Sequence, residues 1–64
     1  MKWLNANLDT PPKDQQQVLI SVNGIYYVSA YDAEQNLYKP FETERIFFNP
    51  EEDNIYWTEF SSPN

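Results

Sequence analysis

Carboxylates are the only reactive groups that this chain supplies in number. Ten Asp and Glu face four Lys and Arg in 64 residues, for a net charge of −6. Histidine and cysteine are absent, so the chain lacks the usual base at neutral pH and the thiolate nucleophile. A carboxylate pair can hydrolyse glycosides, but so short a chain has little room for the deep cleft that such a pair needs. We therefore predict that the protein is not an enzyme.

The densest acidic group is Glu51-Glu52-Asp53, which raises the question of a calcium site. Calcium takes roughly six to eight oxygen ligands around one point, whereas consecutive carboxylates on a turn point in different directions. The glycine-containing loop of the common calcium-binding motif is missing. We expect a solvated acidic turn here, and we predict no metal and no other cofactor.

The segment 41–60 holds six of the ten acidic residues and only one basic residue, Arg45. The candidate interaction surface consists of these six acids: Glu42, Glu44, Glu51, Glu52, Asp53 and Glu59. Spaced carboxylates could occupy a basic groove by mimicking nucleic acid, and a charged rim that favours solubility explains them equally well. Direct binding of DNA or RNA is not expected, because phosphates require a positive surface.

The clearest structural element is a β-hairpin around Asn23-Gly24, between the β-prone runs 18–22 and 25–31. A two-residue turn needs positive φ at both central positions, which asparagine tolerates and glycine accepts at almost no steric cost. The predicted register pairs Val22 with Ile25, Ile20 with Tyr27 and Val18 with Ser29 on one face, and Ser21 with Tyr26 and Leu19 with Val28 on the other. Both faces carry apolar residues, so we expect both to be at least partly covered.

The rest of the chain adds short strands to this hairpin within one domain, 1–64. Further strands are predicted at 37–41, 45–48 and 55–60, and an Asn-Pro pair before acidic residues predicts one helical turn near 50–53. Residues 1–17 are predicted to form an N-terminal arm, and 61–64 a loose tail. Since consecutive strands usually pair, we predict a mainly β fold, a small antiparallel meander of four to five short strands. An open sheet and a barrel both fit this pattern.

Aromatic side chains must supply much of the core, because the chain has no cysteine for disulfides and is short. Two Trp, five Tyr and four Phe are available, and some of them could instead form an aromatic contact surface. The N-terminus lacks a continuous apolar segment, and no apolar run approaches the ~20 residues of a membrane span. We expect a cytoplasmic protein that does not associate with a membrane.

Several landmarks occur in a characteristic order: Trp3, Pro11, the Val-Leu-Ile run at 18–20, Tyr31 and Trp57. This order resembles a family of short phage and prophage proteins of unknown function, in which a Trp, a Leu-Pro loop, a Val-Leu-Val-like strand, a Tyr-containing strand and a His-Trp segment follow one another. The chain departs from that pattern at Thr10, Asp14 and Tyr56, where the family has Leu, Gly and His. The resemblance implies an accessory protein of a phage or mobile element that acts in a bacterial host, with no catalytic residues.

Together these observations predict a small acidic module that binds a protein partner. Two alternatives stay open. The first is a nucleic-acid mimic that inhibits a host defence enzyme or a nucleic-acid-processing enzyme. The second is a structural or assembly subunit whose aromatic residues drive formation of a homo-oligomer.

Overall fold

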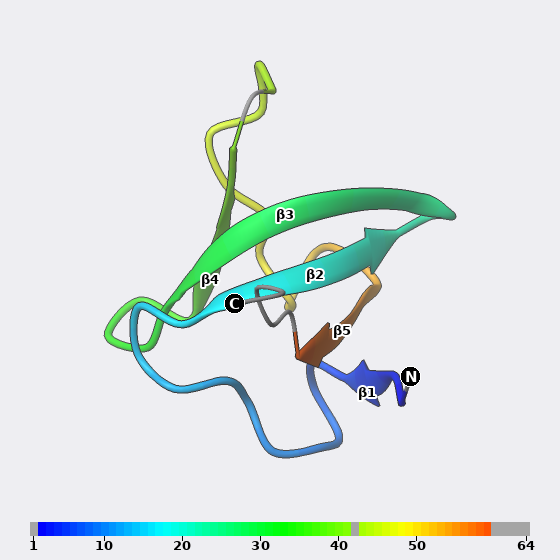
Figure 1. Cartoon of the computed structure of the whole chain (residues 1–64), viewed down its shortest axis with the longest axis vertical. Coiled ribbons are helices and arrows are strands. Elements are labelled where there is room, and N and C mark those ends of the chain that lie inside the picture. The colour runs from blue at the N-terminus through cyan, green and yellow to red at the C-terminus, as the bar shows by residue number, and fades with distance from the viewer. Residues whose placement is uncertain (1, 42, 60–64) are drawn as a thin grey trace, which may run out of the picture.

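The computed structural model describes residues 2–41 and 43–59, and these residues form one open antiparallel sheet (Figure 1). The strands within the described ranges are β1 (Leu4–Asn5), β2 (Gln17–Val22), β3 (Ile25–Asp32), β4 (Leu37–Pro40) and β5 (Ile55–Glu59). Their order across the sheet is β1-β5-β2-β3-β4. The predicted mainly β class, with five strands, is confirmed.

The hairpin of β2 and β3 has the predicted register at every position, from Val22↔Ile25 to Val18↔Ser29. Asn23 and Gly24 have φ values of 53° and 83°, as a type I′ turn requires. The register sets which side chains share a face, because neighbouring residues on a strand point to opposite sides of the sheet.

The predicted meander is wrong for the last strand. Instead of following β4 at the sheet edge, β5 lies between β1 and β2 and pairs with both. This position brings Ile55 beside Val22 and Trp57 beside Ile20, and both β5 side chains are buried there. At the far edge they would have had only one neighbouring strand to pack against, so burial favours the crossover.

The segment between β4 and β5 differs in part from prediction. Residues 45–47 are not a strand, and Phe48 makes only an isolated bridge with Tyr38. The predicted single turn near 50–53 is present as a hydrogen-bonded turn. In it the amides of Glu52 and Asp53 donate to the Asn49 carbonyl at 2.9 and 2.7 Å. Asn49 also caps the turn, because its Oδ1 accepts the Glu51 amide at 2.9 Å.

The N-terminal arm is more ordered than the prediction for 1–17. It contains β1 and a turn in which the Asn5 carbonyl accepts the Asp9 amide at 3.0 Å. The Ala6 amide donates to the Ile55 carbonyl at 3.0 Å and thereby extends the contact with β5. The predicted tail, 61–64, lies outside the described residues.

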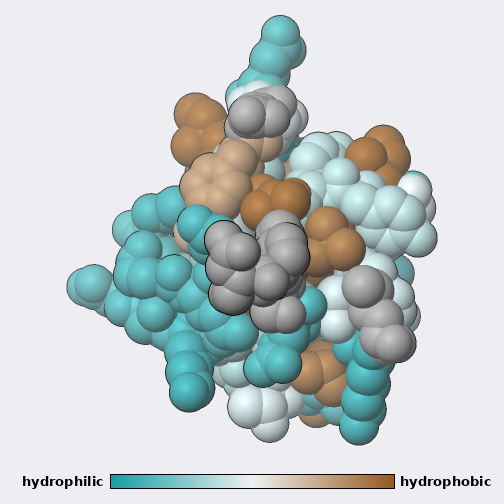
Figure 2. Space-filling model, in the orientation of Figure 1, coloured by the Kyte–Doolittle hydropathy of each residue, from teal (hydrophilic) through white to brown (hydrophobic). Residues whose placement is uncertain are grey.

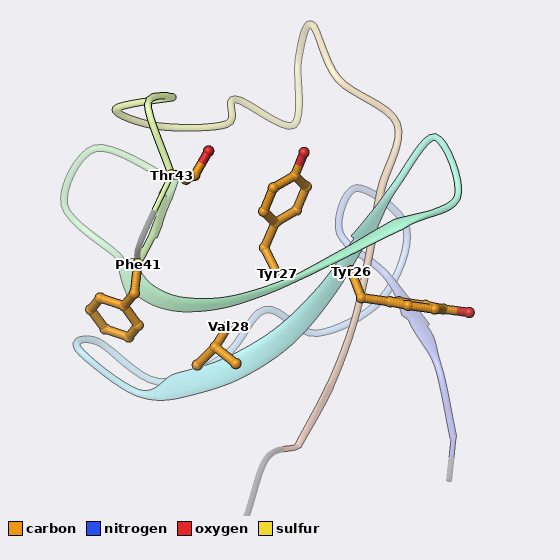
Figure 3. Close-up of a pocket in the computed structure, with 5 residues that line it drawn as sticks. All are labelled: Tyr26, Tyr27, Val28, Phe41 and Thr43. Carbon is orange, nitrogen blue, oxygen red and sulfur yellow. The ribbon is translucent and has the colours of Figure 1, made fainter.

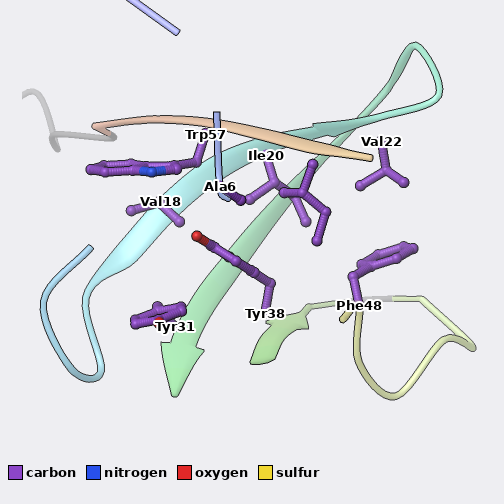
Figure 4. Packing of buried hydrophobic residues seen from close by; sticks show 9 residues of the cluster. Ala6, Val18, Ile20, Val22, Tyr31, Tyr38, Phe48 and Trp57 are labelled. Carbon is purple, nitrogen blue, oxygen red and sulfur yellow. The ribbon is translucent and has the colours of Figure 1, made fainter. Parts of the chain in front are cut away.

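The hydrophobic core lies on one face of the sheet, which we call the inner face (Figure 4). Its buried side chains are Ala6, Val18, Ile20, Val22, Tyr31, Tyr38, Phe48, Ile55 and Trp57. The connection between β4 and β5 covers part of this face with the Phe48 ring, whose centroid lies 4.9 Å from that of Tyr27. The Arg45 guanidinium lies 4.5 Å from the centre of the Phe48 ring and covers it in turn.

Three buried polar atoms on the inner face have no hydrogen-bond partner among the described residues: Ser29 Oγ, Tyr38 Oη and Trp57 Nε1. The Tyr38 side chain is fully buried, and its ring centroid lies 4.8 Å from that of Tyr31. Burial raises the pKa of the Tyr38 hydroxyl above its ordinary value, because the phenolate would lose its hydration.

The turn predicts the first measurable effect. Gly24→Ala should lower the free energy of unfolding by about 1 kcal/mol, because a Cβ is strained at positive φ. The loss should be strain alone, since nothing lies within 4 Å of the added Cβ. Urea unfolding at neutral pH measures the change. Gln35→Ala, at an exposed turn position, is the control and should stay within about 0.5 kcal/mol. Equal stability of the two variants would contradict the strain.

The buried Tyr38 hydroxyl predicts a loss of stability in alkali. Because its pKa is higher in the folded than in the unfolded chain, its contribution is complete below pH 10 and declines as the pH rises above 10. The decline is about 1.4 kcal/mol for each pH unit. Tyr38→Phe should reduce this dependence in urea unfolding between pH 9 and 11.5 and leave the smaller part that comes from Tyr31, whose pKa burial also raises, whereas Tyr26→Phe, at an exposed side chain, should not reduce it. An unchanged alkaline decline in Tyr38→Phe would show that another group causes it.

Candidate functional site

The structure separates the predicted acidic residues into different settings. Glu44 lies on the connection between β4 and β5, and Glu51 and Glu52 lie on the capped turn, all three exposed to solvent. Glu59 is exposed at the end of β5, four residues beyond Ile55 and thus roughly 13 Å along the strand. Glu42 lies outside the described residues.

Asp53 belongs to the structure of the loop rather than to an open surface. Its Oδ2 accepts the Asn49 amide at 3.0 Å and forms a 3.0 Å ion pair with the Arg45 guanidinium. Arg45 also donates from Nε to the Phe47 carbonyl at 2.9 Å. Only 15% of the Asp53 side chain is exposed. The carboxylate therefore joins two parts of the same connection and has little capacity left for a partner.

The acidic residues consequently do not converge on one point. Within 2–41 and 43–59, no three acidic side chains are close enough together to hold a metal ion. The ion pair of Arg45 with Asp53 brings Glu44, next to Arg45, toward the turn that carries Glu51 and Glu52. Of the predicted acidic surface, the three exposed carboxylates of Glu44, Glu51 and Glu52 therefore share the connection between β4 and β5.

A second feature is the face of the sheet opposite the core, which we call the outer face. The registers place Tyr56, Ser21 and Tyr26 in one row across β5, β2 and β3. The next row holds Thr58, Leu19 and Val28. Tyr26 is 63% exposed and Tyr56 is 39% exposed, so two aromatic side chains face solvent across the small Ser21.

Trp3 extends this aromatic surface from the sheet edge. It immediately precedes β1, whose Leu4 faces inward opposite Trp57, so Trp3 lies on the outer side. Its ring stacks on that of Tyr26, with centroids 5.7 Å apart and an angle of 22° between the planes. Such stacking favours a fixed arrangement of the two rings.

The outer face is polar at its other end. Asp32 and Lys39 form an ion pair of 3.0 Å there, and hydrogen bonding to Lys39 lowers the pKa of the Asp32 carboxyl. In Figure 1 the connection between β4 and β5 passes behind β3, so the outer face is toward the viewer. Figure 2, in the same orientation, shows how apolar and polar side chains are distributed over this face. Brown and near-white side chains lie across the upper part of the view, including the hairpin end at the right, and teal side chains cover the lower left.

A hollow of about 680 Å³ adjoins this surface at the edge of β3 (Figure 3). Its lining comes from one strand and from the chain that leaves β4: Tyr26, Tyr27, Val28, Phe41 and Thr43. Phe41 is 45% exposed. The volume is sufficient for a few side chains of a partner.

Sequence reasoning placed Tyr26 opposite Ser21 correctly, but it did not identify this aromatic surface. Trp3 and Tyr56 join Tyr26 only because β5 lies beside β2 and β1 lies beside β5. No local pattern signals that pairing. The one available signal was the apolar character of both hairpin faces, which predicted a second contact surface without its members.

Comparisons of the chain with family models, with curated proteins and with solved structures found no match. The described ranges contain no helix with the length and apolar character needed to span a membrane.

The two roles of the acidic residues predict different costs of substitution. Asp53→Ala should lower the free energy of unfolding by about 1.5 kcal/mol, because it removes a charged acceptor from the Asn49 amide and from Arg45. Glu51→Gln and Glu52→Gln should each change it by less than about 0.5 kcal/mol. Chemical unfolding of the three variants measures the difference. Equal effects in all three would contradict a structural role for Asp53.

Proposed function

We propose that the protein is a small protein-binding module and that its contact surface is the hairpin end of the outer face. One observation carries this proposal: Tyr56, Ser21 and Tyr26 form a solvent-facing row, with Trp3 stacked on Tyr26. Tyr and Trp are enriched among the residues that dominate binding energy at protein interfaces. Each presents a large area and loses little conformational freedom on binding.

Charge favours a protein over a nucleic acid as the partner. Exposed aromatic rings on a sheet can stack on bases, but such proteins combine them with a basic groove that follows the phosphates. This chain carries a net charge of −6, and the basic residue on the outer face, Lys39, is paired with Asp32. A partner with a neutral or basic surface fits both the rings and the charge.

We extend the proposal to the setting of the protein. The order of Trp3, Pro11, the run 18–20, Tyr31 and Trp57 resembles short phage and prophage proteins. An accessory protein of a phage or mobile element would act in the cytoplasm of a bacterial host. This part of the proposal is supported by the resemblance alone.

The proposal predicts that binding depends on the outer-face rings more than on the exposed carboxylates. The test compares three tagged baits in a bacterial lysate, with quantitative mass spectrometry as the readout. They are the wild type, the variant Tyr26→Thr with Tyr56→Thr, and the variant Glu51→Gln with Glu52→Gln. Threonine keeps a β-prone residue at both exposed strand positions, so folding should be retained. A partner enriched by the wild type and by the glutamine bait should be lost at least tenfold, about 1.4 kcal/mol, with the threonine bait.

Other outcomes favour the alternatives. Loss of a nucleic-acid enzyme with the glutamine bait, and its retention with the threonine bait, would favour a nucleic-acid mimic, whose binding should also weaken steeply with salt. Recovery of the bait alone, with a mass and a melting temperature that rise with concentration, would favour a self-associating subunit. Either result would contradict the proposed outer-face contact.

A further inference from the structure

The edge of β3 is only half covered by β4. β4 pairs with the second half of β3, from Asp32↔Leu37 to Ser29↔Pro40. Beyond Pro40 the chain turns away, and among the described residues no strand pairs with 25–28 on this side. Among the described residues, β3 from Ile25 to the Val28 amide therefore has no strand beside it at this edge.

Alternation along β3 identifies the backbone groups at this edge. The Tyr31 amide donates to the Gln16 carbonyl, and the Tyr31 carbonyl accepts the Gln15 amide, both on the β2 side. The backbone N–H and C=O groups of the odd-numbered residues of β3 therefore point toward β2. The backbone groups of the even-numbered residues point away from β2, toward the side of β4. The Val28 carbonyl, for example, accepts the Phe41 amide at 2.9 Å. Three further groups point away from β2 in the same way: the Tyr26 amide, the Tyr26 carbonyl and the Val28 amide. None of these three groups bonds to another backbone group of the described residues.

The side chains along this edge alternate in the way that an added strand requires. In Figure 3, Tyr27 and Thr43 stand on one side of the β3 ribbon, and Val28 and Phe41 stand on the other. The hollow is thus lined by side chains from both sides of this edge. Since successive side chains of a strand point to opposite faces, consecutive residues of an extended peptide could contact the two pairs in turn.

The charges around this edge favour a basic peptide. Glu44 is exposed and directly follows the hollow-lining Thr43. The two nearby cations in the sequence, Lys39 and Arg45, are each 3.0 Å from a carboxylate, that of Asp32 or Asp53. The net charge of −6 extends the same preference over the whole chain, and it opposes the approach of a second copy of this chain.

We propose that the first half of β3, Ile25 to Val28, receives an extended basic segment of the partner as an additional antiparallel or parallel strand. The Tyr26 amide, the Tyr26 carbonyl and the Val28 amide hydrogen-bond to that segment, and its alternate side chains enter the hollow beside Phe41 and Thr43. This inference rests on the proposed function, because the added strand would lie directly beside the outer-face rings. It identifies the partner segment by its conformation and charge.

The test uses the complete chain made by chemical synthesis, so that one backbone amide can be N-methylated with every side chain retained. Random linear peptides of about ten residues, longer than an average strand, are selected on the unmodified protein. The tightest binder is then measured by titration against protein N-methylated at the Val28 amide. Methylation removes a donor and obstructs the edge, while β2–β3 pairing is kept because this amide points away from β2.

The proposal predicts that selected peptides carry an excess of Lys and Arg, and that N-methylation at Val28 weakens binding by at least about tenfold. Hydrogen exchange of the Tyr26 and Val28 amides should slow when the peptide is bound to the unmodified protein. N-methylation at Ile46, which is 81% exposed on the connection between β4 and β5, is the matched control and should leave binding within about twofold.

Three results would overturn the inference. The first is equal affinity of the peptide for the Val28-methylated and unmodified proteins, and the second is failure to select any peptide. The third is dimerisation of the protein alone with slowed exchange at Tyr26 and Val28, which would assign the edge to a second copy. The proposed function is judged separately, by the effect of Tyr56→Thr on partner binding. Tyr56 lies on β5, away from the β3 edge. If Tyr56→Thr abolishes partner binding while N-methylation at Val28 leaves peptide binding unchanged, the outer-face contact is retained and strand addition is rejected.

Discussion

The pairing of β2 with β5 is the constraint on which the rest of the structure depends. It joins residues more than thirty positions apart, as in Val22↔Ile55, and it makes β2 the central strand of the sheet. With a neighbour on each side, Val18 and Ile20 become fully buried. A hairpin alone is marginal in water, and β5 adds a strand on the side of β2 that β3 and β4 leave uncovered. The entropy of closing the intervening loop is the cost of that arrangement.

The same pairing creates the outer face. Once β5 lies beside β2, Tyr56 enters the row of Ser21 and Tyr26, and β1 carries Trp3 to the other side of β5. The inner face is covered by the connection that leads to β5, with Phe48 packed on Tyr27 and under Arg45. On the outer face, the Trp3 ring covers part of the Tyr26 ring. A single crossover therefore decides which face of the sheet holds the hydrophobic core.

The two edge strands of the sheet limit further strand pairing in different ways. At one edge β1 is only two residues long, a length that limits unwanted strand pairing. At the other edge β4 protects half of β3 and then turns away at Pro40, which cannot donate a ladder hydrogen bond. The exposed acids Glu51 and Glu52 lie on the turn that precedes β5, not in the aromatic row. Aromatic contact and acidic charge thus occupy separate parts of the molecule.

The amino-acid sequence by itself determined the features that depend on neighbours along the chain. These are the absence of His and Cys, the turn at Asn23-Gly24, the full β2–β3 register and the Asn49 cap. The φ preferences of Asn and Gly and the two-residue period of a strand act locally, so they can be inferred from residue types. The tertiary structure alone decided the place of β5, the structural role of Asp53, the aromatic row and the open half of β3. Each of these depends on which distant segments share burial, a quantity that the whole chain sets and no local pattern encodes.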